Sequence, residues 1–420
     1  MFSKIQCMLL TRKKMLVSVS YGEDKLELKL PDSVECDFYE CKAIAKEIDS
    51  HAFLGRVTMA EKELFAISQA DLFIVNDAYR PTPTSEILNR LYQNGRLSKK
   101  AKFLIATGTH QAPNETQLKS IFGDLYEKLK KRILIHDARD LNSMVQLDET
   151  EDGFPVFIHR SVAEADKVVV IGSVEPHYFA GYTGGRKAFF PGVCDYETTR
   201  RNHRLAVSFD ATPVKLEGNP VEQNLQSLMK LISDKPVLSI QMVLDNDNQI
   251  QAVFCGKIES SFRRACELAQ KAYSSKIKKR YDLLLAEVRP PLDCSLYQLQ
   301  KSLENSQPAV ANGGTIMLFS PCREGIGSES FYKLAEKWRK PESNSIDEDD
   351  FGIHKLSRVA QIAQRIDVRL YSELEKDVSD KVFFKTEKNP QEIIERLIEN
   401  NKSIRVALVR DASHTVLRTH

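Results

Sequence analysis

Short apolar segments alternate with helical segments from about residue 70 onward, and this alternation limits the possible folds more than any other feature. "ADLFIVND" (70–77) is typical of a buried strand, and "PTSEILNRLYQNG" (83–95) has helical spacing, with Thr84 or Ser85 as its expected N-cap. Further strands are expected at 101–110, 132–138 and 165–174, with a helix opening on Asn114. Strands that alternate with helices form parallel sheets covered by helices, so the sequence predicts an α/β fold.

A second α/β unit is expected from about residue 281. Strands are predicted at 281–288, 313–321 and 403–411, and helices at 295–310, near 355–375 and near 390–400. The charged segment "QKAYSSKIKKR" (270–280) separates the two parts, and the polar stretch 340–352 is predicted to be an exposed loop. We therefore predict two α/β domains, 1–275 with a largely parallel sheet and 276–420, with a cleft between them.

Composition excludes several classes of protein. The 60 Lys and Arg residues nearly balance the 58 Asp and Glu residues, which disfavours nucleic acid as a partner. Eight cysteines without a C-x-x-C spacing disfavour a zinc knuckle and fit a reducing compartment. No apolar run is long enough to cross a membrane, and "TRKK" follows the apolar first ten residues where a signal peptide would have small residues. We expect a cytoplasmic protein that binds neither nucleic acid nor membranes.

Three of the predicted strands end in polar segments: "NDAYRP" (76–81), "TGTHQAP" (107–113) and "EPHYFAGYTGGRK" (175–187). Ligands of parallel α/β sheets bind beyond the carboxyl ends of the strands. If these three strands lie near one another in the sheet, their ends form a site.

Two of these segments carry a histidine, His110 and His177. Imidazoles titrate near neutral pH, so a converging pair can act as acid and base, whereas the alternative is a helix cap and a core residue. His203 lies in "TTRRNHRLA", which we expect to start a helix, and it is a candidate metal ligand. The three histidines also permit a zinc-dependent hydrolase with ligands from separate loops.

Lys187 follows Gly184 and Gly185, where the absence of side chains lets a ligand approach the backbone. Its apolar neighbours favour a desolvated, nucleophilic amine, while a phosphate-contacting lysine is an equal alternative. Arg80 has the planar fork that binds carboxylates or phosphates, or it pairs locally with Asp77.

Tyr297, Gln298 and Lys301 fall on one side of the predicted helix 295–310. They would either face the cleft or form an ordinary solvated surface.

Over about residues 20–410, the chain resembles the lactate racemase family, whose members use a nickel-pincer nucleotide. The resemblance is densest in "DAYRP", "GTHQAPN", "PHYFAGYTGGRKAFFPGV" with "NHRLA", and "YQLQK". It implies a racemase or epimerase that inverts C2 of a small 2-hydroxy acid by removing and returning a hydride.

The resemblance also implies a role for each candidate residue. Lys187 would carry the cofactor, nickel pyridinium-3,5-bisthiocarboxylic acid mononucleotide, through a covalent thioamide-type link, and His203 would be the protein ligand of nickel. His110 and His177 would be the acid and base. Other positions would help to bind the cofactor (Asp77, Gly184, Gly185) or the substrate (Arg80, Tyr297, Gln298, Lys301).

The sequence departs from the family pattern at Asn76, Tyr79 and Gln111, where a second Asp, Thr and Arg are more common. These positions are expected near the substrate. As the substrate we therefore expect a 2-hydroxy acid larger or more polar than lactate at least as much as lactate itself. Two alternatives remain besides the racemase, the zinc-dependent hydrolase and a non-catalytic binding homologue. A homo-oligomer is left open.

Overall fold

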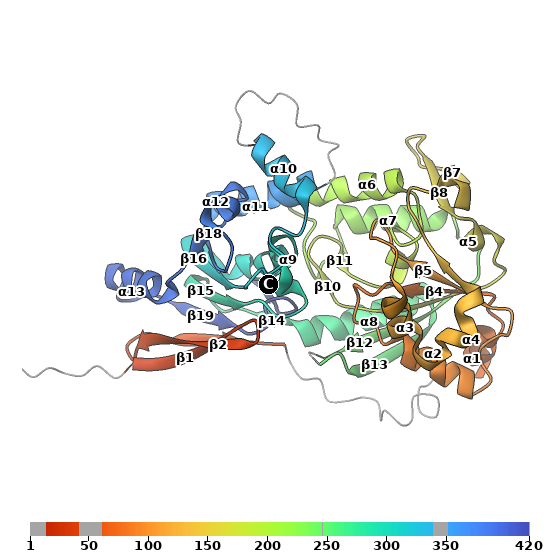
Figure 1. Ribbon diagram of the computed structural model, residues 1–420, viewed down its shortest axis with the longest axis horizontal. Helices are drawn as coiled ribbons and strands as arrows, with labels where there is room; N and C mark the ends of the chain where they lie inside the picture. Colours follow the sequence, from red (N-terminus) through yellow and green to blue (C-terminus); the bar gives the residue numbers. More distant parts are fainter. Residues whose placement is uncertain (1–13, 42–60, 246, 339–351, 420) are drawn as a thin grey trace, which may run out of the picture. The chain divides into compact units, whose positions relative to one another are not determined.

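The computed structural model describes residues 14–41, 61–245, 247–338 and 352–419, which fall into two compact units (Figure 1). Unit 1 takes the described parts of Met1–Glu40, Ser275–Ile346 and Leu356–His420, and unit 2 those of Cys41–Ser274 and Asp347–Lys355. Residues before Glu40 thus group with the C-terminal part of the chain. Apart from Gly352, the predicted loop at 340–352 lies outside the described residues.

Unit 2 is built on a six-stranded sheet in the order β13-β12-β9-β4-β5-β6. All neighbouring strands are parallel except β12 and β13. The prediction of an α/β fold with a largely parallel sheet is confirmed. The strands are β4 (Leu72–Asn76), β5 (Lys102–Ala106), β6 (Ile133–Ile135), β9 (Val168–Ser173), β12 (Val237–Leu244) and β13 (Ile250–Lys257).

Alternate residues of these strands enter two separate cores. Phe73, Phe103 and Ile171 pack on one face with helices α2 and α3, while Leu72 and Val170 pack on the other with helix α7. Strands buried on both faces read as continuous apolar runs, which is why they are recognisable in the sequence. The helices of unit 2 are α1 (Glu61–Ser68), α2 (Thr84–Gln93), α3 (Glu115–Phe122), α4 (Tyr126–Leu129), α5 (Arg160–Glu164), α6 (Tyr196–Arg204), α7 (Pro220–Lys230) and α8 (Ile258–Tyr273).

The predicted N-caps had different outcomes. Asn114 caps α3, with its side chain accepting from the backbone N–H of Gln117 in a reciprocal capping box. Helix α2 instead begins after Pro83, without a side-chain cap, so the prediction of Thr84 or Ser85 as its N-cap is wrong.

Two hairpins complete unit 2. They pair β7 (Met144–Glu149) with β8 (Pro155–His159) and β10 (Pro176–His177) with β11 (Gly181–Tyr182).

Unit 1 has its own six-stranded sheet, in the order β18-β17-β16-β15-β19-β3, with every neighbouring pair parallel. The β1–β2 hairpin contributes Val19 and Leu28 to the core that contains Leu285 and Leu408. The strands are β1 (Lys14–Tyr21), β2 (Asp24–Pro31), β3 (Cys36–Tyr39), β15 (Tyr281–Glu287), β16 (Val310–Phe319), β17 (Asp367–Tyr371), β18 (Lys385–Glu387) and β19 (Val406–Val409), and the short β14 (Ser274–Lys276) pairs with β20 (Val416–Arg418).

The helices outside unit 2 are α9 (Leu296–Ser306), α10 (Glu329–Trp338), α11 (Ile353–Arg365), α12 (Lys376–Lys381) and α13 (Pro390–Asn400). The first three residues of α11 group with unit 2. The helix predicted near 355–375 was too long, because β17 occupies 367–371. In the described part of the chain, no helix has the length and apolar character needed to cross a membrane.

Candidate active site

The sheet order of unit 2 brings the three polar strand ends to one edge. Strand β4 lies between β9 and β5 and runs parallel to both, so Asn76, Ala106 and Ser173 end on the same side. The segments that follow carry Asp77 and His110. The condition set by the sequence, that these strands be near one another, is therefore met.

A carboxylate orients His110. The Nδ1 atom of His110 lies 2.6 Å from Oδ2 of Asp77, which is almost fully buried, while His110 is 48 % exposed. Because a carboxylate accepts, Nδ1 carries the proton and the lone pair of the neutral ring lies on Nε2. The other oxygen, Oδ1, accepts from the backbone N–H of Tyr79, whose ring centroid lies 4.9 Å from that of His110. The side chain of Asp77 therefore pairs with His110, not with Arg80.

His177 has the opposite arrangement. It ends the two-residue strand β10 and is 8 % exposed. Its Nδ1 accepts from the backbone N–H of Ala180 at 3.2 Å, so the neutral ring carries its proton on Nε2. The ring stacks on Tyr178 and meets Phe179 edge-on at 4.5 Å between centroids.

Phe179 connects His177 with two other predicted residues. Its ring centroid lies 5.0 Å from that of His203 and 5.6 Å from Nζ of Lys187. The rings of His177, His203 and Phe179 and the amine of Lys187 therefore belong to one cluster in unit 2.

The loop that carries Lys187 is held by close packing. Gly184 and Gly185 have φ of 78° and 54°, a region that other residues rarely adopt. A Cβ on Gly184 would lie 2.7 Å from Gln241 Oε1, and one on Gly185 would lie 2.6 Å from the Phe262 ring. The structure gives both glycines a packing reason, and their predicted contact with a cofactor stays a prediction.

A buried ion pair stands next to Lys187. Arg186 is 2 % exposed and donates from Nη1 to Glu222 at 2.7 Å and from Nη2 to Glu259 at 3.1 Å. Its guanidinium also lies over the Phe262 ring. Beyond Lys187, residues from Ala188 to Cys194 pack into the core beneath the sheet. Both sides of Lys187 are therefore fixed.

The amine of Lys187 is in an unfavourable place for a charge. Although part of the side chain remains accessible, burial, aided by the nearby charge of Arg80, lowers the pKa of Lys187 to about 7. An amine with this pKa is largely neutral just above neutral pH and can act as a nucleophile. The alternative of a permanently charged, phosphate-contacting lysine is less favoured.

The segment "TTRRNHRLA" enters helix α6 in its first turn, as expected, and His203 lies in the last turn of that helix. Its Nδ1 donates to the carbonyl of Thr199, one turn earlier, at 2.8 Å, and the lone pair of the neutral ring is then on Nε2. Burial, followed by the effect of Lys187, lowers the pKa of His203 to about 3. A neutral imidazole with a fixed tautomer is the form that ligates a metal.

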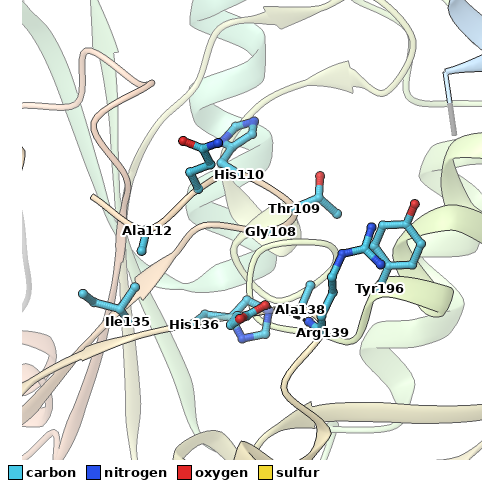
Figure 2. Close-up of a pocket in the computed structure, with 11 residues that line it drawn as sticks. Gly108, Thr109, His110, Ala112, Ile135, His136, Ala138, Arg139 and Tyr196 are labelled. Atoms are coloured by element: carbon cyan, nitrogen blue, oxygen red, sulfur yellow. Dashed lines mark hydrogen bonds between the residues drawn. The ribbon is translucent and has the colours of Figure 1, made fainter. Parts of the chain in front are cut away.

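A pocket of about 420 Å³ lies beside His110. Figure 2 shows it between the loop that carries Thr109 and His110 and the loop that carries Ala138 and Arg139. The guanidinium of Arg139 lies 3.7 Å from the ring centroid of Tyr196, at the start of α6. Ligand pockets typically have volumes of roughly 300–1,000 Å³, so this one is of sufficient size for a small molecule.

The predicted residues Tyr297, Gln298 and Lys301 all lie on α9 of unit 1. The other eight residues of α9 are buried, and these three are partly exposed. They form the accessible side of the helix, as their spacing predicts. Their role in substrate binding stays a prediction.

Three residues of the site were not singled out in the sequence. Phe179 belongs to the quoted motif "PHYFAG", but its apolar side chain gave no chemical signal. Arg186 resembles a surface residue until the positions of Glu222 and Glu259 are known. The ring of His354 lies 5.8 Å from that of His203, and its Nε2 lies 3.4 Å from the Tyr178 hydroxyl, contacts that no local pattern indicates.

Asn76 was expected at the pocket wall, but its side chain takes part in a polar network at the strand ends. Its side-chain amide donates to the hydroxyl of Thr82, which is 2.9 Å from that of Ser173. Ser173 in turn donates to the carboxylate of Glu175. Asn76 therefore joins the ends of β4 and β9 through a polar network.

Comparison with known proteins identifies the family. Residues 21–212 match the lactate racemase N-terminal domain, and residues 284–414 match the lactate racemase C-terminal domain. The chain belongs to the lactate racemase family. Its members include the lactate racemase of Thermoanaerobacterium thermosaccharolyticum, 27% identical over 342 residues, which cover 78% of this chain and 79% of that protein. The lactate racemase of Lactiplantibacillus plantarum is 29% identical over 266 residues, 62% of each chain. As a member of this family, the protein is an isomerase.

Solved structures agree in fold. The lactate racemase apoprotein from T. thermosaccharolyticum matches 96% of this chain and 100% of its own, with a TM-score of 0.84 and 24% identity. A protein from Thermotoga maritima matches 83% of this chain and 93% of its own, with a TM-score of 0.64 and 16% identity.

Over the described ranges, no three His, Cys, Asp or Glu side chains are grouped to hold a metal ion. This argues against a zinc site made of His110, His177 and His203, although a single ligand such as His203 can still complete a site supplied by a cofactor.

Proposed function

We propose that this lactate racemase family member inverts C2 of a 2-hydroxy acid, with a nickel-pincer nucleotide attached to Lys187. The observation that carries the proposal is the cluster around Phe179, where His177, His203 and Lys187 all approach one ring. A hydrolase has no use for Lys187 in this position. A covalently held cofactor uses all three groups.

The residues fit the cofactor chemically. A largely neutral amine on Lys187 is suited to a covalent link with an acyl-type carbon, and the lone pair of His203 is directed away from its Thr199 bond. The chemistry that the cofactor supplies when bound is reversible acceptance of a hydride. Such an acceptor is useful because the carboxylate of a 2-hydroxy acid opposes removal of the C2 hydrogen as a proton.

The two histidines have different tautomers, which suit them to opposite proton transfers. His110, with its lone pair on Nε2 and its Nδ1 proton bound by Asp77, is prepared to accept the proton of the substrate hydroxyl. His177, with a hydrogen on Nε2, can donate a hydrogen bond to the substrate oxygen, and it would return the proton to the product from its imidazolium form. The reverse reaction requires the roles to exchange. Asp77 thereby acts as a positioning residue for His110, and its expected contact with the cofactor stays a prediction.

The remaining predicted residues would bind the substrate carboxylate. Arg80 contributes its charge near Lys187, and a planar guanidinium is suited to a carboxylate. Lys301, Gln298 and Tyr297, the accessible side chains of α9, complete the proposed set.

Two measurements test the proposal. Protein produced in a host that makes the cofactor should carry an adduct of several hundred daltons, which Lys187→Ala removes. Racemisation in D2O should leave protium at C2, because a hydride returns to the carbon from which it came. Deuterium at C2 would mean proton abstraction and would contradict the mechanism, and bound zinc without an adduct would favour a hydrolase.

A further inference from the structure

Tyr79 is an exposed aromatic residue fixed at the proposed site. Its side chain is 54 % exposed, yet its ring packs against His110 with centroids 4.9 Å apart and planes inclined by 59°. The Asp77 carboxylate that binds His110 also accepts from the Tyr79 backbone N–H at 3.2 Å. An Asx turn of this kind fixes the backbone of Tyr79. One buried carboxylate therefore binds the ring of His110 and the backbone of Tyr79.

The fold does not use the Tyr79 hydroxyl. Across the ranges that the structure describes, no hydrogen bond joins this hydroxyl to another residue. Among the described residues of unit 2, the hydrophobic clusters on the two faces of the sheet and around Phe179 do not include Tyr79. Its stable contact is with the proposed base His110, so its exposed face is available to a molecule that binds there.

Space for a large group exists beside the same histidine. The 420 Å³ pocket is lined by His110 and Gln111 together with the apolar side chains of Ala112 and Ile135 (Figure 2). Ile135 is 38 % exposed in its wall. Tyr79 is not among the lining residues, and His110 is the residue that the pocket and the Tyr79 ring have in common.

We infer that Tyr79 determines specificity, and that the substrate is a 2-hydroxy acid with an aromatic substituent rather than a methyl group on C2. This inference rests on the proposed racemase function. An aromatic substituent can meet the Tyr79 ring edge-on or offset, and this contact adds to the gain from burying its surface.

The test compares two substrates with the cofactor-loaded enzyme. Initial rates of loss of optical rotation give kcat/KM for 3-phenyllactate and for lactate. The wild type should favour 3-phenyllactate by about tenfold or more. Tyr79→Thr should lower this ratio about tenfold, mainly by raising KM for 3-phenyllactate, and Tyr79→Phe should retain most of the preference.

A matched control is available in the same unit. Tyr92 on α2 is 47 % exposed and contacts Lys128 on the surface, away from the strand-end segments. Tyr92→Thr should leave the ratio of the two kcat/KM values unchanged. Tyr79 is exposed, so its variants should fold, which a circular-dichroism melt verifies.

The outcomes separate this inference from the proposed function. If the wild type racemises both acids equally well, or if Tyr79→Thr lowers both kcat/KM values by the same factor, Tyr79 does not determine specificity and the inference is overturned while the racemase stands. If the loaded enzyme with its adduct on Lys187 racemises no 2-hydroxy acid, the proposed function fails, and the inference fails with it.

Discussion

The two proposed catalytic histidines lie in regions of unit 2 that are built differently. His110 follows β5, is 48 % exposed, and is oriented by the side chain of Asp77. His177 lies in the loop of residues 176–193 after β9, called here the β9 loop, is 8 % exposed, and is oriented by a backbone N–H. A single substitution can change the partner of His110, whereas the partner of His177 depends on the conformation of the loop.

Because the two regions differ in burial, they should differ in how well their positions tolerate substitution. The β9 loop places Phe189 and Phe190 in the core under the sheet, so changes there disturb the packing. Tyr79 and Gln111, which depart from the family pattern, lie instead in the accessible segments after β4 and β5. Substitutions in the accessible segments should therefore disturb the fold less than substitutions in the β9 loop.

The buried region should respond most strongly to loss of a charge. Arg186→Met leaves the carboxylate of Glu222 buried without its closest cation, and we expect a loss of about 3–5 kcal/mol in the free energy of unfolding. Urea denaturation of the apoprotein measures this loss. Arg200→Met, which removes an ion pair to the half-exposed Glu197, is the control and should cost about 1 kcal/mol or less. Equal losses in the two variants would show that Arg186 does not hold the β9 loop.

The accessible region should lose activity rather than stability. Asp77→Asn removes the charge that fixes the Nδ1 proton of His110, and we expect kcat/KM to fall by about 100-fold, with a changed pH–rate profile. Asp71→Asn, at the start of β4, is the control because Asp71 binds backbone N–H groups at the other end of the strand. A loss of activity without a change in the pH–rate profile would mean that Asp77 has only a structural role.

Much of the fold follows from the sequence where both faces of a strand are buried. β4, β5, β9 and β15 appear as uninterrupted apolar runs, and the predicted segments contain all four. The ends of helices were harder to predict. The apolar spacing of α11 continues into β17, which begins almost directly after that helix. Thr84 and Ser85 also have the right chemistry for a cap, but Pro83 occupies the capping position.

For the candidate site, the sequence singles out polar residues next to glycine and proline at strand ends, such as His110 and Lys187, and their catalytic roles stay predictions. The tautomers of the histidines could not be predicted, since they depend on Asp77 and on the Ala180 N–H, partners set by three-dimensional contacts. Arg186 shows the same limit. Its partner Glu222 is distant in the sequence, and no local pattern reveals a buried ion pair.

A further effect should appear in the pH dependence of stability. The folded pKa of Lys187 is about 7 against an ordinary 10.5, so between these values the unfolded chain binds a proton that the folded chain does not. The free energy of unfolding therefore rises with pH in this window, and the cost of burying the charge remains in full below pH 7. Apoprotein with Lys187→Met should lack this rise when urea midpoints are compared at pH 6.5, 8 and 9.5.

Lys119 provides the control for this comparison, because its exposed amine pairs with Glu115 and its pKa is raised instead. Lys119→Met should keep the wild-type pH dependence over the same range. If Lys187→Met also keeps it, the amine is charged in the folded protein and the proposed nucleophile is wrong.

The smallest effect is expected where the segment that carries His110 joins helix α3. Asn114→Ala removes the half of the capping box in which the Asn114 side chain accepts from the backbone N–H of Gln117, and we expect a loss of about 1 kcal/mol in the free energy of unfolding. Ser85→Ala near the start of α2 is the control, since that helix has no side-chain cap, and it should change stability by less than about 0.5 kcal/mol. Because Asp77 fixes His110 independently of this cap, kcat/KM should stay at the wild-type value in Asn114→Ala. A large loss of activity would mean that the helix, rather than the carboxylate, positions the base.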